Sequence, residues 1–215
     1  MVQVKICGIT RSEDALLAAQ LGATAVGFVF WPGSRRYIDP YRARQIVLQL
    51  PPLVTAVGVF VDQPFSFVHQ VAGLVQLGAV QLHGMEAPET YRGSRHRVIK
   101  ALTIDRDVQP ERLAEIPFGV TLLLDSHDPV TIGGTGRTID WDVAARVAAI
   151  RRVILSGGLT AENVTSAIAR VKPYGVDVSS GVEATPGIKD TERLRAFMKA
   201  VSEAPRVRAG VSREP

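Results

Sequence analysis

The chain has little cysteine, few aromatic residues and no concentration of charge of one sign. Cys7 is the only cysteine in 215 residues, which excludes an internal disulfide and fits a reducing compartment. Aromatic residues are 6% of the chain, and its formal net charge of +4 comes from basic residues spread among acidic ones. No basic stripe interleaved with aromatics occurs, so we expect no nucleic-acid partner, whereas a small anionic ligand suits this charge.

Signals for membranes, export and metals are also missing. No run of about 18 apolar residues occurs, so no membrane span is expected. The amino terminus enters VQVKIC directly, without the basic, apolar and small-residue regions of a targeting peptide, which predicts a cytoplasmic protein. The four histidines include no pair spaced for one helix face and no companion cysteines, so only a metal site assembled from separate strands stays open.

The chain does contain a repeating pattern of short apolar runs. Its 46% apolar content over 215 residues is enough to bury one large core. Several runs are almost continuous in Val, Ile, Leu and Phe, as in parallel strands buried on both faces. The eight runs are VKIC (4–7), AVGFVF (25–30), TAVGVFV (55–61), AVQLH (79–83), VIKALT (98–103), VTLLLD (120–125), RVILSGG (152–158) and GVDVSSG (175–181).

Segments of helical length separate these runs. The segment 12–22 is predicted to begin with Ser12 as its N-cap and to end at Gly22. The next segment has Asp39 as its predicted N-cap, with Pro40 at the first helical position. Both starts and stops follow the residue preferences of helix termini, so these segments predict helices between the strands.

Two further helices are predicted near the carboxyl terminus. The segment TAENVTSAIARV begins with Thr160 and places Asn163 at the third helical position. The last helix, KDTERLRAFMKAV, carries apolar residues along one face, which predicts that this face packs on the core: Leu194, Phe197, Met198 and Val201.

Strand-like runs that alternate with helix-like segments predict an α/β fold, a single (β/α)8 TIM barrel over residues 1–203. A doubly wound open sheet is the alternative, but CGITRSED after the first strand is not the glycine-rich dinucleotide-binding turn. Residues 204–215 lack apolar periodicity, which predicts a flexible tail.

Reactive side chains gather at the predicted carboxyl ends of the strands, where barrel enzymes carry their active sites. Cys7 ends the first strand; it is either a buried small hydrophobe or a proton abstractor, and the second role requires a lowered pKa. Asp125 ends the sixth strand, where loss of hydration would raise its pKa and suit a general acid. Its alternative role is a helix cap or a turn residue.

Other polar residues at the carboxyl ends of the strands have two possible interpretations each. Arg35 and Arg36 follow the second strand and could grip a carboxylate with two hydrogen bonds, or lie solvated in a loop. His83 could contact a substrate or carry a proton, or be a satisfied histidine at the barrel rim.

Glycine-rich stretches follow the sixth, seventh and eighth strands. They are GGTG (133–136), SGG (156–158) and SSG (179–181). Glycine lets the backbone approach a ligand, and successive N–H groups bind anions. The loops after strands seven and eight are the frequent phosphate site of barrels. We therefore predict a phosphate site that includes Gly134, Gly157, Gly158, Ser180 and Gly181.

Taken in order, the motifs resemble those of the phosphoribosylanthranilate isomerases of tryptophan biosynthesis. They are KICGIT, GFVF, SRRYI, VGVFV, VQLHG, LLLDS, GGTG, LSGGL, ENV, DVSSGVE, PG and KD, and the resemblance runs from residue 4 to about residue 198. It implies an Amadori rearrangement of N-(5-phosphoribosyl)anthranilate to 1-(2-carboxyphenylamino)-1-deoxyribulose 5-phosphate. No cofactor is implied, because the anthranilate nitrogen serves as the electron sink.

The resemblance also implies roles for individual residues. Asp125 would be the general acid that opens the ribose ring, and Cys7 the general base that removes the C2 proton. Arg36 would hold the anthranilate carboxylate. Asp177 and His83 match motif positions without an assigned role. The glycine loops would hold the 5-phosphate, and the protein is expected to be a monomer or a homodimer.

Three alternatives stay open on the sequence. A histidine-pathway isomerase performs the same type of rearrangement but needs a second phosphate site near strands two to four, where this chain has GFVFWPGSRRY. An enzyme that accepts both substrates is a variant of this alternative. A metal-dependent sugar-phosphate epimerase lacks ligands. A non-catalytic phosphate-binding barrel would keep the glycine loops but would not need Cys7 and Asp125.

Overall fold

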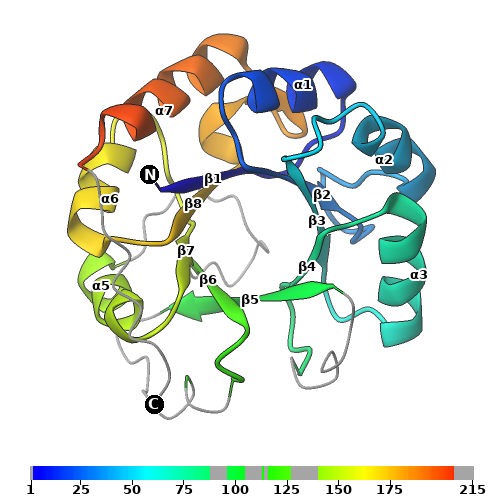
Figure 1. Cartoon of the computed structure of the whole chain (residues 1–215), viewed down its shortest axis with the longest axis horizontal. Coiled ribbons are helices and arrows are strands. Elements are labelled where there is room, and N and C mark those ends of the chain that lie inside the picture. Colours follow the sequence, from blue (N-terminus) through cyan, green and yellow to red (C-terminus); the bar gives the residue numbers. More distant parts are fainter. Residues whose placement is uncertain (1, 88–95, 105–112, 114–115, 127–139, 206–215) are drawn as a thin grey trace.

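The computed structural model describes residues 2–87, 96–104, 113, 116–126 and 140–205. Eight parallel strands close into a barrel in chain order, with β1 paired to both β2 and β8 (Figure 1). Closure confirms the predicted TIM barrel over the open sheet. The strands are β1 (Gln3–Ile6), β2 (Ala25–Val29), β3 (Thr55–Phe60), β4 (Ala79–Leu82), β5 (Arg97–Ile104), β6 (Thr121–Ser126), β7 (Val153–Leu155) and β8 (Gly175–Val178).

Helices surround the ring of strands (Figure 1). The stretches after β4 and β5 lie largely outside the described residues. The helices of the described part are α1 (Ser12–Gln20), α2 (Pro40–Val47), α3 (Phe65–Val75), α5 (Trp141–Ile150), α6 (Val164–Val171) and α7 (Thr191–Glu203).

The amino-terminal caps of α1 and α2 differ in how well the sequence predicted them. Asp39 is the predicted N-cap, and its side chain accepts hydrogen bonds from the backbone at the start of α2, with Pro40 as the first helical residue. The prediction for Ser12 is wrong, because Ser12 is already helical. Arg11 precedes it, and an ion pair of 2.6 Å between Arg11 and Asp14 spans the first turn.

The start of α6 also differs from the prediction. The helix begins at Val164, so Asn163 lies before it rather than at its third position. The Asn163 side chain accepts from Thr160 N at 2.9 Å and donates to Gly158 O at 2.8 Å. An asparagine that bonds the backbone in this way stabilises a turn in place of a helical turn, and here it braces the loop that follows β7.

A short hairpin that the sequence did not predict follows β8. It comprises a 3-10 turn (Ser180–Val182) and the antiparallel strands β9 (Glu183–Thr185) and β10 (Ile188–Lys189). The following helix, α7, is capped by Asp190, whose carboxylate accepts from Arg193 N. The hairpin places two charged residues beside the first strand, as described below.

The apolar core has two parts. The larger part lies between the strands and the helices, and α7 contributes Leu194, Phe197 and Met198 to it, as predicted; Val201 packs against it partly buried. The smaller part fills the barrel interior with Val57, Ala79, Ile99, Ala101, Leu123 and Ile154. Because successive strand residues face opposite sides, every second residue points inward. Towards the carboxyl ends of the strands, several of the inward-facing positions hold polar residues.

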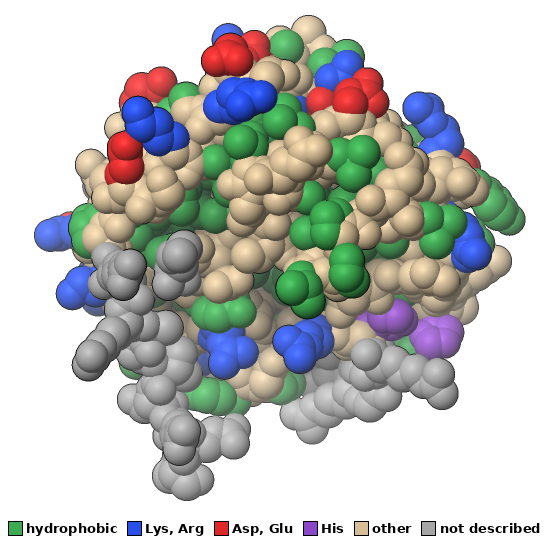
Figure 2. All heavy atoms as spheres, turned by 45° about the horizontal axis from the view of Figure 1, so that its top comes forward, with side chains coloured by type: hydrophobic (Ala, Val, Ile, Leu, Met, Phe, Trp, Pro, Cys, Tyr) green, Lys and Arg blue, Asp and Glu red, His purple; other side chains and the backbone are tan. Residues whose placement is uncertain are grey.

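No helix among the described residues is long and apolar enough to cross a membrane. Figure 2 shows acidic and basic side chains intermixed near the edge of the molecule that carries α7 and α1. Exposed ion pairs join charges along α7, among them Arg195 with Glu192 and Lys199 with Glu203. On this face, charge is therefore mixed rather than of one sign.

Candidate active site

A cavity opens at the carboxyl ends of the strands. It brings together five side chains that the sequence predicted as site residues: Cys7, Arg36, His83, Asp125 and Asp177. An apolar wall completes it, formed by Val29, Trp31, Val59 and Val61, with Ser34, Gln81, Ser156 and Ser179 as further polar lining residues. Thiol, carboxyl, imidazole and guanidinium groups from five separate segments thus meet in one place.

The predicted glycine-loop residues lie near this cavity but not on its wall. Gly157 and Gly158 have φ angles of +83° and +63°, which favour glycine. A side chain at Gly181 would overlap the Leu159 carbonyl oxygen, so the loops after β7 and β8 are in close contact. Ser180 begins the 3-10 turn in the second loop. Gly134, with the whole GGTG stretch, lies outside the described residues.

The Cys7 thiol is buried, with 8% of the residue exposed, in a small cluster with Val29 and Val59. Burial raises its pKa, the Asp177 carboxylate adds to this effect, and the nearby Lys5 ammonium opposes it. The proton-abstractor interpretation required a lowered pKa, and this condition is not met in the structure. The physical reason is that loss of solvation around the sulfur outweighs the effect of the nearby cations Lys5 and Lys189.

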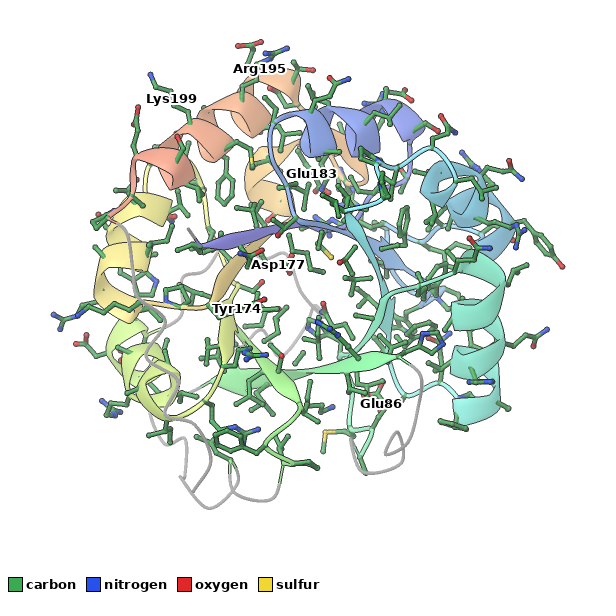
Figure 3. All side chains as sticks on the ribbon, in the orientation of Figure 1. Glu86, Tyr174, Asp177, Glu183, Arg195 and Lys199 are labelled. Atoms are coloured by element: carbon green, nitrogen blue, oxygen red, sulfur yellow. The ribbon has the colours of Figure 1, made fainter. Side chains whose placement is uncertain are left out.

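Lys5 and Asp177 form a buried ion pair beneath the thiol. The strand register places the two residues side by side on β1 and β8, and the Lys5 ammonium donates to Asp177 Oδ1 at 2.9 Å. Figure 3 shows Asp177 inside the ring of strands. Although burial disfavours the ammonium, the attraction of Asp177 and Cys7 raises the pKa of Lys5. Lys5 is therefore a permanent positive charge within reach of the Cys7 sulfur.

Arg36 is held by the hairpin that follows β8. Its Nε and Nη2 atoms donate to the Glu183 carboxylate at 2.9 and 2.7 Å. Lys189 donates to the same carboxylate at 2.9 Å and also to the carbonyl oxygens of Cys7 and Ser179. Glu183 and Lys189 are almost fully buried. This network ties the guanidinium group of the cavity to the end of the strand that carries the thiol.

His83 joins two other polar groups of the cavity. Its Nε2 atom lies 3.4 Å from Asp125 Oδ2, and its Nδ1 atom lies 2.9 Å from Gln81 Nε2. Asp125 is buried, with 6% exposed, as its place at the end of an apolar strand predicted. A carboxyl group shielded from water and in contact with an imidazole is placed for proton transfer.

Sequence reasoning missed Lys5, Gln81, Glu183 and Lys189. Strand alternation could have found the first two, because Lys5 and Gln81 stand two positions before Cys7 and His83 and so face the same interior. Glu183 and Lys189 stand in the motif stretches DVSSGVE and KD, but the turn that folds them back over β1 is not encoded by an apolar repeat, so their contact with Arg36 and Cys7 was not predicted.

Among the described residues, no three or more histidine, cysteine, aspartate or glutamate side chains gather as a metal site would require. The groups that do gather are a thiol beside an ammonium and a carboxyl beside an imidazole. The protein therefore belongs to the (β/α)8-barrel class, with proton-exchanging side chains gathered in a cavity at the carboxyl ends of its strands, where barrel enzymes carry their active sites.

The model of the N-(5'-phosphoribosyl)anthranilate (PRA) isomerase family matches residues 4–200. The chain belongs to this family.

Individual relatives agree with the family match. The chain is 49% identical over 203 residues to an N-(5'-phosphoribosyl)anthranilate isomerase of Pelobacter propionicus, covering 94% of this chain and 97% of that protein. A crystal structure of a phosphoribosyl anthranilate isomerase in complex with reduced 1-(o-carboxyphenylamino)-1-deoxyribulose 5-phosphate has a TM-score of 0.84 at 46% identity, covering 94% and 99%. Monomers generated from the dimeric enzyme of Thermotoga maritima also give 0.84, at 45% identity and with 94% and 99% covered.

Proposed function

We propose that this protein converts N-(5'-phosphoribosyl)anthranilate to 1-(2-carboxyphenylamino)-1-deoxyribulose 5-phosphate, an aldose–ketose isomerisation of tryptophan biosynthesis. The observation that carries the proposal is the meeting of Cys7, Asp125 and Arg36 in one cavity of a chain that belongs to the isomerase family. The family match over nearly the whole chain favours this reaction over a histidine-pathway isomerisation and over a non-catalytic barrel.

Asp125 is the general acid of the proposed Amadori rearrangement. Its carboxyl proton goes to the ribose ring oxygen as the bond between that oxygen and C1 breaks. The lone pair of the anthranilate nitrogen forms the C1–N double bond, so the opened intermediate is a cationic Schiff base. Burial of Asp125 supports this role, because a site shielded from water directs its proton to the substrate rather than to solvent.

Cys7 is the general base of the second step. Its thiolate takes the C2 proton, the C–H electrons form the C1–C2 double bond, and the nitrogen recovers its lone pair. The resulting enol-amine becomes the ketone when a proton leaves the C2 hydroxyl and one is added at C1. The cationic Schiff base beside the sulfur, together with Lys5, favours the thiolate at this stage, which offsets the effect of burial on the pKa of Cys7.

The two anionic ends of the substrate have separate partners. Arg36 holds the anthranilate carboxylate through the guanidinium edge that Glu183 leaves available, and Trp31 and the cavity valines line the aromatic ring. The phosphate binds at the glycine loops after β7 and β8, where Gly157 and Gly181 let the backbone N–H groups come close. Asp177 and His83 line the cavity between these ends. No cofactor takes part in this scheme.

The protein would act in the cytoplasm on a small anionic substrate, as a monomer or a homodimer. A dimeric relative supports the second state, which sedimentation of the purified chain would distinguish from the first.

The reaction is tested by the anthranilate fluorescence of freshly made phosphoribosylanthranilate, followed with and without the protein and with EDTA present. We expect rapid, metal-independent loss of the signal. We also expect Cys7→Ser and Asp125→Asn to reduce kcat by about 10²–10⁴-fold while the proteins stay folded, because each lacks one proton-transfer group. Loss of activity in EDTA, or near-normal turnover by Cys7→Ser, would contradict the scheme.

A further inference from the structure

Three polar side chains lie inside the barrel close to its apolar inner core. Lys5, Gln81 and Asp177 are at most 5% exposed. Lys5 and Asp177 neutralise each other in the ion pair described above. Gln81 takes no part in that pair; its side-chain amide instead contacts the ring of His83, the residue that follows the end of β4.

The contact between Gln81 and His83 restricts where the imidazole carries its proton. Gln81 Nε2 is an amide nitrogen, which donates hydrogen bonds and does not accept them. It lies 2.9 Å from His83 Nδ1, so in this amide orientation Nδ1 is the acceptor and carries no hydrogen. The ring hydrogen is then on Nε2, the nitrogen that lies 3.4 Å from Asp125 Oδ2.

We propose that Gln81 is a positioning residue that holds His83 in the Nε2–H tautomer, with this N–H group directed at the carboxyl group of Asp125. The assignment rests on the proposed function, in which Asp125 is the general acid, and extends it to a residue that does not itself react.

The tautomer decides how His83 affects proton transfer. With hydrogen on Nε2, the imidazole donates to the carboxylate that remains after Asp125 has released its proton, and so stabilises that carboxylate. With hydrogen on Nδ1, a lone pair would face Asp125. That lone pair would accept the acid proton in competition with the substrate and would offer nothing to the carboxylate. Only the first arrangement assists ring opening.

The way Gln81 is buried supports a functional role. Within the described part of the chain, its Oε1 atom is a buried side-chain oxygen without a hydrogen-bond partner. Leaving an acceptor unsatisfied in a barrel interior is unfavourable, and an apolar side chain of similar size would avoid it. The amide is therefore not explained by packing, whereas its nitrogen has a specific partner in His83.

The tautomer can be read without measuring activity. Long-range ¹⁵N–¹H correlation spectra of the full chain labelled at histidine give each ring nitrogen either the shift of a protonated or of an unprotonated atom. A His83→Asn sample assigns the His83 signals among those of the four histidines. We expect an unprotonated Nδ1 and a protonated Nε2 in the unmodified protein. The reverse pattern would overturn the inference.

Variants at Gln81 test whether this residue sets the pattern. In Gln81→Glu the new carboxylate accepts a hydrogen bond, so His83 Nδ1 should become protonated. We then expect kcat to fall roughly 100-fold, which is the lower end of what a positioned proton-transfer group contributes, and KM to change little. Gln81→Met removes the hydrogen bond at similar volume and should give a mixture of tautomers. The matched control is Gln49→Glu, the same substitution at an exposed position, which should leave the His83 signals unchanged.

The outcomes separate this inference from the proposed function. An unprotonated Nδ1 that persists in folded Gln81→Glu and Gln81→Met would show that Gln81 does not set the tautomer. A change of tautomer in Gln81→Glu with unchanged kcat would show that the tautomer does not assist Asp125. Failure of the proposed function would instead appear as an unmodified protein that shows no turnover although its spectra still show an unprotonated His83 Nδ1.

Discussion

Cys7 stands between opposing electrostatic influences. Burial and the Asp177 carboxylate raise its pKa, whereas Lys5 favours the thiolate. Gly27 on the neighbouring strand makes this arrangement possible, because a side chain there would come within 2.8 Å of the Cys7 sulfur and 3.0 Å of the Lys5 nitrogen. The thiol and the ammonium are thus packed against a position where an added Cβ atom would force a side chain to move. A cation so close to the sulfur should control its ionisation.

Replacing Lys5 with methionine should raise the pKa of Cys7 further, since the variant keeps an unbranched side chain of similar shape and loses its charge. Cys7 is the only cysteine, so the rate of alkylation by iodoacetamide as a function of pH reports its thiolate fraction without background. We expect slower alkylation of Lys5→Met at every pH below the pKa. Lys172→Met, at an exposed position on the end of α6, is the control and should not change the rate. Equal rates in Lys5→Met would mean that Lys5 does not act on the thiol.

Among the elements, the hairpin β9–β10 contributes most to the site beyond the barrel strands. Glu183 in β9 accepts from Arg36 and from Lys189 in β10, and Lys189 reaches the carbonyl oxygen of Cys7. Figure 3 shows Glu183 close to β1, on the inner side of α7. A short element after the last strand therefore fixes both Arg36 and the end of the first strand.

Glu183→Gln should destabilise the protein by about 3 kcal/mol, because Arg36 and Lys189 lose a buried counter-charge. It should also raise KM more than it lowers kcat, since Arg36 would no longer be held for the substrate carboxylate. Urea unfolding and steady-state kinetics measure the two effects. Asp142→Asn, which breaks an exposed ion pair with Arg170, should change neither. A large fall in kcat with an unchanged KM would instead show that Glu183 acts in the chemical step.

The loops after β7 and β8 meet at Gly181, and Gly181→Ala should separate them. The added methyl group would overlap the Leu159 carbonyl oxygen, which is backbone and cannot rotate away. We expect weaker protection by inorganic phosphate against thermal unfolding, and a higher KM. Gly73→Ala is the matched substitution in α3, where a Cβ atom meets nothing within 4 Å. It should stabilise the protein by about 0.5–1 kcal/mol through helix propensity, with unchanged KM. Unaltered phosphate protection in Gly181→Ala would contradict the loop assignment.

At the scale of the whole molecule, the closed barrel makes stability depend on buried charges. Polar residues sit inside a ring of strands that has no edge, so each charge needs a partner within the ring or just above it. Lys5 has Asp177, and Glu183 has Arg36 and Lys189. Protonation of one of these carboxylates breaks a pair that water cannot replace.

Acid should therefore weaken the fold through Glu183. Burial favours its protonated form, but hydrogen bonds from Arg36 and the charge of Lys189 hold the pKa of Glu183 below its usual value of 4.5. A folded-state pKa below the unfolded one means that the unfolded chain binds more protons. The contribution of Glu183 to the free energy of unfolding is therefore present above about pH 4.5, and it is lost as the pH falls through the folded-state pKa.

We expect the difference in unfolding free energy between the unmodified protein and Glu183→Gln to shrink as the pH falls below about 4.5. Urea titrations across this range measure it. A difference that stays constant with pH would show that the Glu183 carboxylate does not supply the acid dependence.

Much of the architecture could be predicted from the sequence, because buried parallel strands are nearly continuous apolar runs and barrel enzymes carry their active sites at the carboxyl ends of such strands. Cys7, His83 and Asp125 follow from that rule. The residue preferences of helix termini gave the wrong helix start at Ser12 and at Asn163. At both starts, side chains form local bonds: Arg11 with Asp14, and Asn163 with the backbone. Local hydrogen bonding of this kind does not alter the apolar pattern, so the pattern cannot reveal it.

The sequence by itself determined the eight strands, the inward direction of their alternate residues and the family motifs, because these depend on local spacing and on residue type. Only the tertiary structure decided that Lys5 faces Asp177 across β1 and β8, that Glu183 returns to bind Arg36, and that the Cys7 pKa is raised rather than lowered. These features join residues separated by up to about 180 positions. A charge or a pKa inside the barrel is set by neighbours in space, and closure of the ring brings the first and last strands together.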